Sequence, residues 1–327
     1  MSRHRGEFSL IRDVFGPLAR HAPGALALSD DAALIEAPAG QTQVVTADAM
    51  VAGVHFATSD PPDLVARKLL RVNLSDLAAM GAAPAAYTLV AAISPEIRGD
   101  WIDRFAQGLA VDQAEFGISL IGGDTVATPG PPTFCVTAIG WVPDGNALRR
   151  NGASPGDRVF VSGTIGDGAL GLGLASGELV APTPEDREAL IGRLRLPSPR
   201  VSLGRRLHGK ASAAIDISDG LVADLGHLCR ASGVGANVFI DRIPLSGAAQ
   251  SLVAGQPALI ETVITGGDDY ELLFAVPASQ TGDVAELARE LDMVLTDIGE
   301  ITAQTDVVVR DSEGVSMALS SPGFQHF

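Results

Sequence analysis

The sequence of 327 residues contains few cysteines, few lysines and no long apolar run. Its two cysteines, Cys135 and Cys229, stand in apolar segments, so we expect buried free thiols rather than a disulfide framework or a zinc site. No stretch of 18 apolar residues is present, and the segment from Gly6 to Phe15 is too charged for a signal peptide. We therefore expect no membrane-spanning helix and a cytoplasmic protein.

Positive charge is also scarce. The net charge is −16, and the only lysines are Lys68 and Lys210. A nucleic-acid partner is excluded on this ground, because phosphate backbones need a basic surface. Phosphate-bearing small molecules stay possible if metal ions mediate the contact.

What the chain does have is enough apolar material for a large core, with 46% hydrophobic and 19% charged residues. Its length favours two domains, and turn-forming residues between Pro143 and Asp157 place the boundary near residue 148. We therefore expect domains at 1–148 and 149–327.

The hydrophobic periodicity predicts an α/β fold in both halves. The second half alternates strands and helices, with strands at 158–162, 213–216, 236–240, 272–276, 293–298 and 307–310. In the first half the pattern predicts the helices Glu7–Leu18, Pro62–Gly81 and Trp101–Phe116 and the strands Ala27–Ile35, Gln43–Ala47, Ala86–Ile93, Ile118–Ile121 and Phe134–Val142.

The segment Ala213–Leu221 runs from a buried strand through an acidic corner into a helix. Asp216 is expected at the strand end and Asp219 in the first helical turn. Backbone N–H groups at a helix N-terminus attract phosphate, and carboxylates beside them can hold magnesium. In the alternative interpretation, Ser218 or Asp219 is only the N-cap of the helix. The segment alone does not decide between the two.

Acidic corners of this kind recur along the chain. Most follow an apolar segment and are flanked by glycine or small residues, without a lysine nearby. Gathered carboxylates repel one another and need cations, and hard oxygen ligands suit Mg²⁺ and the phosphates of ATP. The alternative is that they are separate caps and turns. The corners are Asp30-Asp31, Thr46-Ala47-Asp48, Asp76, Gly123-Asp124, Asp216–Asp219 and Gly267-Asp268-Asp269.

Two motifs that suggest other chemistry are rejected. Gly166–Gly171 matches a dinucleotide pattern but lacks the second strand with its terminal acid, so we interpret it as a tight turn that starts a helix. Gly204–Lys210 has Ala211 where a P-loop needs Ser or Thr. No Ser-His-Asp or Cys-His arrangement can be argued from spacing. This absence fits phosphoryl transfer, in which catalysis rests mostly on positioning the substrates and neutralising their charge.

Taken together, the motifs resemble those of the thiamine-monophosphate kinase family, in the aminoimidazole-ribonucleotide-synthetase-like superfamily. The resemblance covers nearly the whole chain in order. It implies two α/β domains, an N-terminal sheet that pairs across a homodimer, and ATP with several Mg²⁺ ions in the cleft between the domains. The implied reaction converts ATP and thiamine monophosphate to ADP and thiamine diphosphate. The motifs are Asp30–Ala33, Thr46–Phe56, Val72–Ala82, Gly122–Thr125, Ile215–Leu221, Gly266–Leu272 and Gly323–Phe327.

The resemblance also implies roles for individual residues. The catalytic residues would be Asp124 and Asp216. Mg²⁺ would be held by Asp30, Thr46, Asp48, Asp76, Asp124, Asp216 and Asp219. ATP would contact Gly123, Asp124, Arg150 and Ser218, and the substrate would contact His55, Asp268 and Phe324.

Three positions depart from the family pattern. The family commonly has glutamate where Asp268 stands, so the substrate contact there would be shorter or bridged by water. Ser29 replaces a frequent glycine, and Ala47 replaces a hydroxyl-bearing residue. Any side-chain metal ligand at Ala47 is lost, although its backbone carbonyl could serve.

Within the superfamily, selenophosphate synthetase would need a reactive cysteine or selenocysteine near the N-terminus, and a hydrogenase-maturation member would end in cysteine. Neither feature is present. The cyclo-ligase of purine synthesis is a further rival. A rival from another class is a dimeric scaffold that binds nucleotide without turnover, against which the intact set of acids argues.

Overall fold

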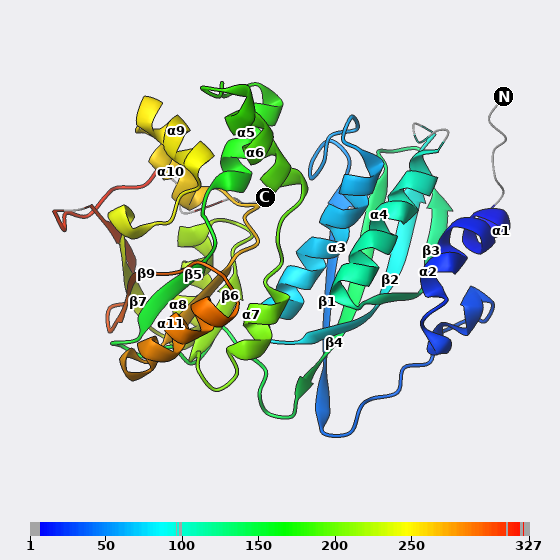
Figure 1. Ribbon diagram of the computed structural model, residues 1–327, viewed down its shortest axis with the longest axis horizontal. Helices are drawn as coiled ribbons and strands as arrows, with labels where there is room; N and C mark the ends of the chain where they lie inside the picture. The colour runs from blue at the N-terminus through cyan, green and yellow to red at the C-terminus, as the bar shows by residue number, and fades with distance from the viewer. Residues whose placement is uncertain (1–6, 96, 98–99, 312, 321–322, 324–327) are drawn as a thin grey trace. The chain divides into compact units, whose positions relative to one another are not determined.

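The computed structural model describes residues 7–95, 97, 100–311, 313–320 and 323 (Figure 1). The chain divides into two units. The N-terminal unit comprises Met1–Leu77 with Ala82–Gly145, and the C-terminal unit comprises Ala78–Gly81 with Asn146–Phe327. Each unit combines a β-sheet with helices, so the predicted α/β fold of two domains is confirmed. In the described part of the chain, no helix is long and apolar enough to cross a membrane.

The N-terminal unit begins with helical turns. The predicted helix Glu7–Leu18 is present, but Ile11–Phe15 in its middle is a π-helix. The strand predicted over Ala27–Ile35 is wrong, because Leu26, Ala27 and Leu28 all have positive φ, which a β-strand cannot accommodate. The elements are α1 (Glu7–Leu10), η1 (Ile11–Phe15), α2 (Gly16–Ala19) and the 3₁₀ segment η2 (Pro23–Leu28).

The sheet of this unit has four strands in the order β1-β4-β2-β3. β4 is antiparallel to both β1 and β2, whereas β2 and β3 run parallel. A helix is therefore needed to connect β2 to β3, and α4 (Trp101–Phe116) provides it. The strands are β1 (Gln41–Val51), β2 (Ala83–Ile93), β3 (Ser119–Ala127) and β4 (Thr133–Pro143).

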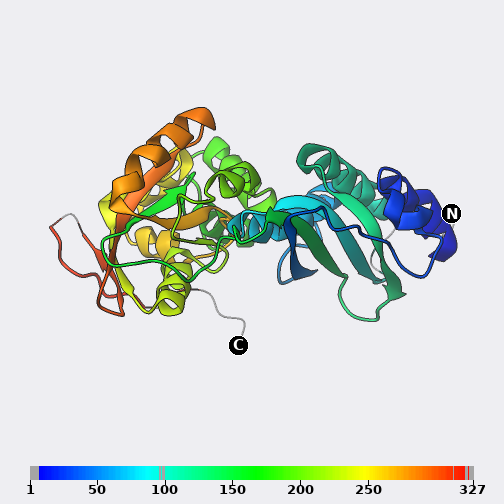
Figure 2. The same ribbon diagram turned by 90° about the horizontal axis from the view of Figure 1, so that it is seen from below.

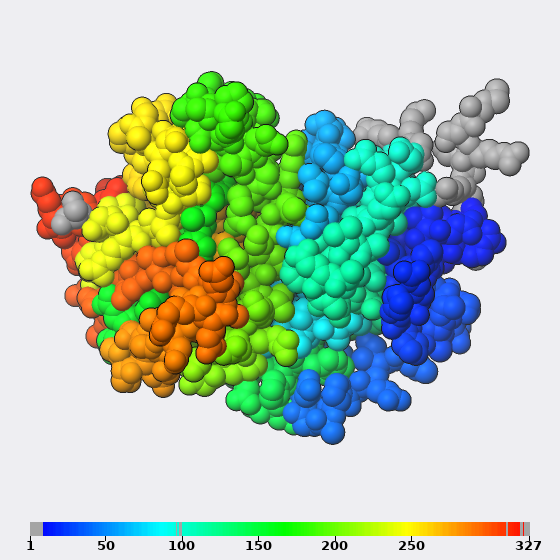
Figure 3. All heavy atoms as spheres, viewed as in Figure 1, coloured from blue at the N-terminus to red at the C-terminus, as the bar shows by residue number. Residues whose placement is uncertain are grey.

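One face of this sheet is covered by α4 and by α3 (Pro62–Ala79), as Figure 2 shows from below. In the space-filling view the atoms of these two helices are exposed on the face toward the viewer (Figure 3). Side chains alternate between the faces, and Asp48 faces α3 because it meets Asp76 there. By strand alternation and register, Val45 and Val90 lie on the opposite face, where they are 56% and 40% exposed.

The C-terminal unit has a six-stranded sheet in the order β10-β7-β9-β5-β8-β6. All neighbouring pairs are antiparallel except β10 with β7. The strands are β5 (Arg158–Ser162), β6 (Ala213–Asp216), β7 (Gly235–Phe239), β8 (Leu272–Val276), β9 (Leu295–Thr302) and β10 (Val307–Arg310).

Helices cover both faces of this second sheet. In β5, Val159 and Val161 pack on one face with side chains from α5, α6 and α8, whereas Phe160 packs on the other with side chains from α7 and α11. Burial on both sides explains why β8 is apolar at all five positions. The helices are α5 (Asp167–Ser176), α6 (Pro184–Arg195), α7 (Val201–Arg206), α8 (Leu221–Ser232), α9 (Gly247–Gly255), α10 (Leu259–Thr265) and α11 (Thr281–Glu290), with 3₁₀ turns η3 (Ile240–Arg242) and η4 (Ala278–Gln280).

Candidate functional site

The acidic corner between β6 and α8 has a different cap from the one the sequence suggests. Helix α8 begins at Leu221, so Asp219 precedes the helix instead of lying in its first turn. Neither Ser218 nor Asp219 is the N-cap residue. The Asp224 carboxylate accepts the backbone N–H groups of Ser218, Asp219 and Gly220, at 3.0, 3.0 and 3.1 Å. Asp224 therefore satisfies the donors of the corner, and the carboxylates of Asp216 and Asp219 are not used as caps.

Asp224 is a residue that the sequence interpretation missed. It is buried, and burial raises its pKa to about 7 although the three N–H donors act in the opposite direction. The available signal was an acid four residues after Gly220, on the first turn of an amphipathic helix. Its separation from the acidic corner in the sequence concealed its contact with that corner.

A second acidic corner, Gly266–Tyr270, is hydrogen-bonded directly to the first. The Asp268 N–H donates to the Ser218 carbonyl at 2.9 Å, and the Tyr270 N–H donates to the Ile217 carbonyl at 2.8 Å. The approach is close enough that a Cβ on Gly267 would lie 2.1 Å from the Ser218 oxygen. The fold therefore brings predicted metal, nucleotide and substrate residues of the C-terminal unit into one continuous surface.

The glycine motif at Gly166 starts helix α5, as the sequence analysis expects. Gly166 has a φ of 85° and is the N-cap residue. The buried Asp269 carboxylate accepts the N–H groups of Gly166 and Gly168, at 2.7 and 3.2 Å. The two N–H groups that a dinucleotide phosphate would need are therefore already bound by a carboxylate of the protein, which argues against a dinucleotide site at this turn.

Arg150 lies near the first corner. Its carbonyl accepts the Ser232 hydroxyl at 2.9 Å, and its charge is one of the causes that lower the pKa of His227, after burial and Arg230. His227 and Arg230 line a cavity of about 390 Å³ together with Asp219. The predicted ATP contact Arg150 and the predicted metal ligand Asp219 therefore occupy the same region. Phe324 lies outside the described residues.

In the N-terminal unit, β1 and α3 bring three of the predicted metal ligands together. The Thr46 hydroxyl donates to Asp76, and the Asp48 N–H donates to Asn73 Oδ1 at 3.1 Å. The pKa of Asp48 is raised to about 6, first by burial and then by the charge of Asp76 and a hydrogen bond with it. Asn73 and Asp76 lie three residues apart on α3, so both face β1.

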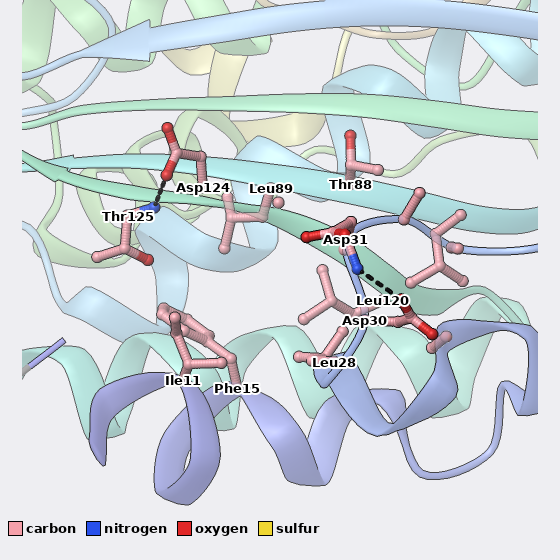
Figure 4. A pocket seen from close by; sticks show the side chains of 16 residues that line it. Ile11, Phe15, Leu28, Asp30, Asp31, Thr88, Leu89, Leu120, Asp124 and Thr125 are labelled. Carbon is pink, nitrogen blue, oxygen red and sulfur yellow. Dashed lines mark hydrogen bonds between the residues drawn. The ribbon is translucent and has the colours of Figure 1, made fainter. Parts of the chain in front are cut away.

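A second cluster lies on β3. Asp30, Asp31 and Asp124 line a cavity of about 430 Å³ whose apolar lining includes Ile11 and Phe15 (Figure 4). The Asp124 carboxylate accepts the N–H of the following residue at 2.8 Å. The backbone of Gly122 and Gly123 completes this wall of the cavity. A pocket that combines an apolar surface with a few acids suits a ligand with both an apolar and a charged part.

Within one chain, these two clusters are separated. Asp48 is paired with Val136 of β4, Val136 with Leu89 of β2, and Leu89 with Gly123 of β3. Three strand spacings correspond to about 14 Å. Accordingly, the described residues include no group of three or more His, Cys, Asp or Glu side chains that could hold a metal ion. In the N-terminal unit, the single acidic constellation suggested by the sequence is therefore divided into two separate clusters, each of which we call a half-site.

His55, a predicted substrate contact, is held in the turn after β1. Its Nδ1 accepts the Val51 N–H at 3.1 Å, which assigns the ring proton to Nε2 when the imidazole is neutral. The Lys68 ammonium donates to the His55 carbonyl at 3.4 Å. Both contacts restrict the orientation of the imidazole relative to β1.

Comparison with known proteins extends over both units. Residues 29–142 match the family of the AIR synthase related protein, N-terminal domain, and residues 154–312 match its C-terminal domain. The chain is 44% identical to the thiamine-monophosphate kinase of Caulobacter vibrioides, over 95% of this chain and 86% of that protein.

Solved structures show the same similarity. The crystal structure of thiamine-monophosphate kinase from Stenotrophomonas maltophilia K279a superposes with a TM-score of 0.85 at 42% identity, over 97% of this chain and all of that one. A structure of AaThiL complexed with AMPPCP and TMP superposes with a TM-score of 0.78 at 30% identity, over 98% of this chain and 97% of that one.

Proposed function

This chain belongs to the thiamine-monophosphate kinase family of AIR synthase related proteins, and from that membership we propose that it transfers the γ-phosphoryl group of ATP to thiamine monophosphate. The products are ADP and thiamine diphosphate. The observation that carries the proposal is the direct hydrogen bonding between the corners Asp216–Asp219 and Gly266–Tyr270. These hydrogen bonds place the corner Asp216–Asp219, which suits metal-bound phosphates, beside the corner Gly266–Tyr270, which suits the thiamine part of the substrate.

The oxygen-rich clusters fit Mg²⁺. Asp48 and Asp76 are close enough to raise the pKa of Asp48, so a divalent cation between them would relieve their repulsion. The Thr46 hydroxyl adds a third hard oxygen. Bound Mg²⁺ would neutralise phosphate charge on the two polyanions. The residues proposed to hold it are Asp30, Thr46, Asp48, Asp76, Asp124, Asp216 and Asp219.

The protein's remaining task is to orient two anions. The second pKa of a phosphomonoester is about 6, so the attacking phosphate oxygen is already ionised near neutral pH and needs no general base. Asp268 and His55 orient the thiamine part, with Phe324 as the third proposed contact. Gly123, Asp124, Arg150 and Ser218 orient ATP, and the guanidinium of Arg150 offsets phosphate charge. Catalysis then rests on alignment and electrostatics, for which Asp124 and Asp216 are the proposed catalytic residues.

We further propose that the working form is a homodimer in which each N-terminal half-site is completed by the partner chain. The support is the position of Asp48 on β1 and Asp124 on β3, the two edge strands of the four-stranded sheet, which stand three strand spacings apart, or about 14 Å. Edge strands have unpaired backbone groups that a second sheet can cover. A two-fold pairing of β1 with the β3 of the partner would bring the edge that carries Asp48 next to the edge that carries Asp124.

The cytoplasm is the proposed location. Cys135 and Cys229 are both free, as expected for a reducing compartment. Cys229 is buried as the sequence predicts, whereas Cys135 is only partly buried because its strand has one face without helices.

A turnover assay tests the function. The protein is incubated with ATP, Mg²⁺ and thiamine monophosphate, and thiamine diphosphate is quantified by chromatography. We expect stoichiometric formation of ADP and thiamine diphosphate. Nucleotide binding without any product would contradict the proposal and favour a non-catalytic scaffold.

A further inference from the structure

The corner that carries Asp268 has an unusual backbone. Asp268 has a φ of 70° and Tyr270 a φ of 52°. Left-handed φ is uncommon outside glycine and is a marked outlier for a residue as bulky as tyrosine. Each such residue costs about 1–3 kcal/mol and persists only where the surroundings hold it. Two of them within three residues indicate that this corner is shaped for a specific side-chain orientation.

The side chains of Asp269 and Glu271, which alternate in the chain with Asp268 and Tyr270, bind other segments of the unit and hold the corner in place. Both are buried, with side chains 2% and 0% exposed. Asp269 accepts the N–H groups of Gly166 and Gly168 at the start of α5. The backbone before Tyr270 is thereby held to the interior of the unit.

Glu271 is the more extensively bound of these two residues. Its carboxylate accepts the Ser162 hydroxyl at 2.6 Å and an N–H of Arg193 at 2.9 Å, and Arg200 binds it through two nitrogens. A bidentate arginine pair adds directional as well as electrostatic stabilisation. Tyr270 therefore lies in the chain between two residues whose side chains are both bound in the interior of the unit.

The hydroxyl of Tyr270 donates to Asp268 Oδ1 at 3.0 Å. Asp268 and Tyr270 are both half-buried, whereas Asp269 and Glu271 are fully buried. A neutral hydroxyl fixes one oxygen of the carboxylate without neutralising its charge. Held by the hydroxyl, the carboxylate loses rotational freedom, which lowers the entropic cost of binding a cationic partner.

We propose that Tyr270 is a positioning residue for substrate binding: its hydroxyl holds the Asp268 carboxylate toward the cationic thiamine part of the substrate. This inference rests on the proposed function, in which Asp268 binds thiamine monophosphate. The thiazolium ring is a permanent cation and the aminopyrimidine carries N–H donors, so a preoriented carboxylate matches both. An aspartate is one methylene shorter than a glutamate, and the hydroxyl fixes which way the shorter side chain points.

The test is Tyr270→Phe, which keeps the ring and removes only the hydroxyl. We expect the KM for thiamine monophosphate to rise roughly tenfold, as for loss of one hydrogen bond to a charged group. The KM for ATP and kcat should stay within about twofold. Tyr87→Phe is the matched control: Tyr87 is the chain's other tyrosine, its hydroxyl donates to Gln113 in the N-terminal unit, and its loss should leave all three constants unchanged.

Each outcome has a defined meaning. An unchanged KM for thiamine monophosphate in an active Tyr270→Phe enzyme would overturn the inference, and so would an equal rise in both KM values, which indicates general loosening. Asp268→Ala provides a second route: its KM for thiamine monophosphate must rise at least as much as that of Tyr270→Phe, and in the double variant Tyr270→Phe must raise it no further, whereas a further rise would overturn the inference. A wild-type protein without turnover would refute the proposed function itself, before any variant is compared.

Discussion

Asp216 is the last residue of β6, the edge strand of the six-stranded sheet, and is paired with Leu272, the first residue of β8. It is 4% exposed. A carboxylate at such a position is held by a rigid backbone. The neighbouring N–H groups are satisfied by Asp224 and not by Asp216. Its carboxylate is therefore not the cap of this corner.

The substitution Asp216→Asn keeps the shape of the side chain and removes its charge. We expect kcat to fall about 100-fold, or about 3 kcal/mol, because the group that balances phosphate charge in the transition state is lost. The melting temperature should not fall, since one of several repelling carboxylates is removed. Steady-state kinetics and thermal unfolding of the same variant check this. An active but destabilised variant would identify Asp216 as a structural residue.

The repulsion between the carboxylates of Asp48 and Asp76 predicts that activity depends on a bound metal ion. We expect turnover to stop in excess EDTA and to return with added Mg²⁺. Mg²⁺ alone should also raise the melting temperature of the wild-type protein, since a ligand that binds the folded state stabilises it. In Asp48→Asn this gain should shrink. Full turnover in EDTA, or an equal gain in the variant, would contradict the metal proposal.

At the scale of elements, the C-terminal unit depends on two loops that contact each other at backbone distance. Gly267 and Gly220 make this approach possible, because a Cβ on either would lie within 2.6 Å of a carbonyl of the other loop. The loops extend from β6 and into β8, which are neighbouring strands. Sheet register therefore fixes both ends of the contact, and glycine permits its closeness.

Gly267→Ala should push the two loops apart. We expect kcat/KM to fall at least tenfold for both substrates and the free energy of unfolding to fall by about 1–3 kcal/mol, since the Ser218 carbonyl accepts the Asp268 N–H and cannot move freely. Gly282→Ala in α11 is the matched control, because its Cβ would meet nothing within 4 Å and alanine favours a helix. Kinetics and urea unfolding measure both effects. Equal behaviour of the two variants would mean that the close contact is unimportant.

For the whole molecule, the main consequence of the fold is the division of the N-terminal acids between two edge strands. One chain holds Asp48 and Asp76 at one edge of the sheet and Asp30 and Asp124 at the other. The exposed Val45 and Val90 on the uncovered face are consistent with a further covering chain. Two copies related by a two-fold axis could complete both sites at once.

Heterodimers test this arrangement. Asp48→Asn and Asp124→Asn chains with different tags are co-expressed and purified through both tags. We expect each homodimer to be inactive and the heterodimer to recover about half of wild-type activity, because one of its two sites has both native acids. An Asp48→Asn/Asp76→Asn heterodimer should stay inactive, since both changes affect the same half-site. No recovery in the first pair, or a monomer by light scattering, would contradict the shared site.

Local signals in the sequence determined much of the fold. Helix α4 has the predicted bounds Trp101–Phe116, because an apolar stripe runs up to Gly117, which takes the left-handed conformation at the helix end. Strand β5 likewise matches. The strand expected at Ala27–Ile35 is wrong because positive φ at three consecutive residues cannot be inferred from side-chain type. Helices α9, α10 and α11 were not predicted; α9 and α10 are short and form beside other helices of the unit.

The sequence also identified the acids as a set, because their placement after apolar segments is a local property. Tertiary structure alone decided which of them meet. Strand register placed Asp48 and Asp124 on opposite edges of one sheet, and the pairing of β6 with β8 brought Ser218 to Asp268. Asp224 caps the corner Ser218–Gly220, and Tyr270 contacts Asp268, only because the fold brings these groups within hydrogen-bond distance. Such contacts depend on register and on close backbone approach, which are properties of paired strands and not of any single segment.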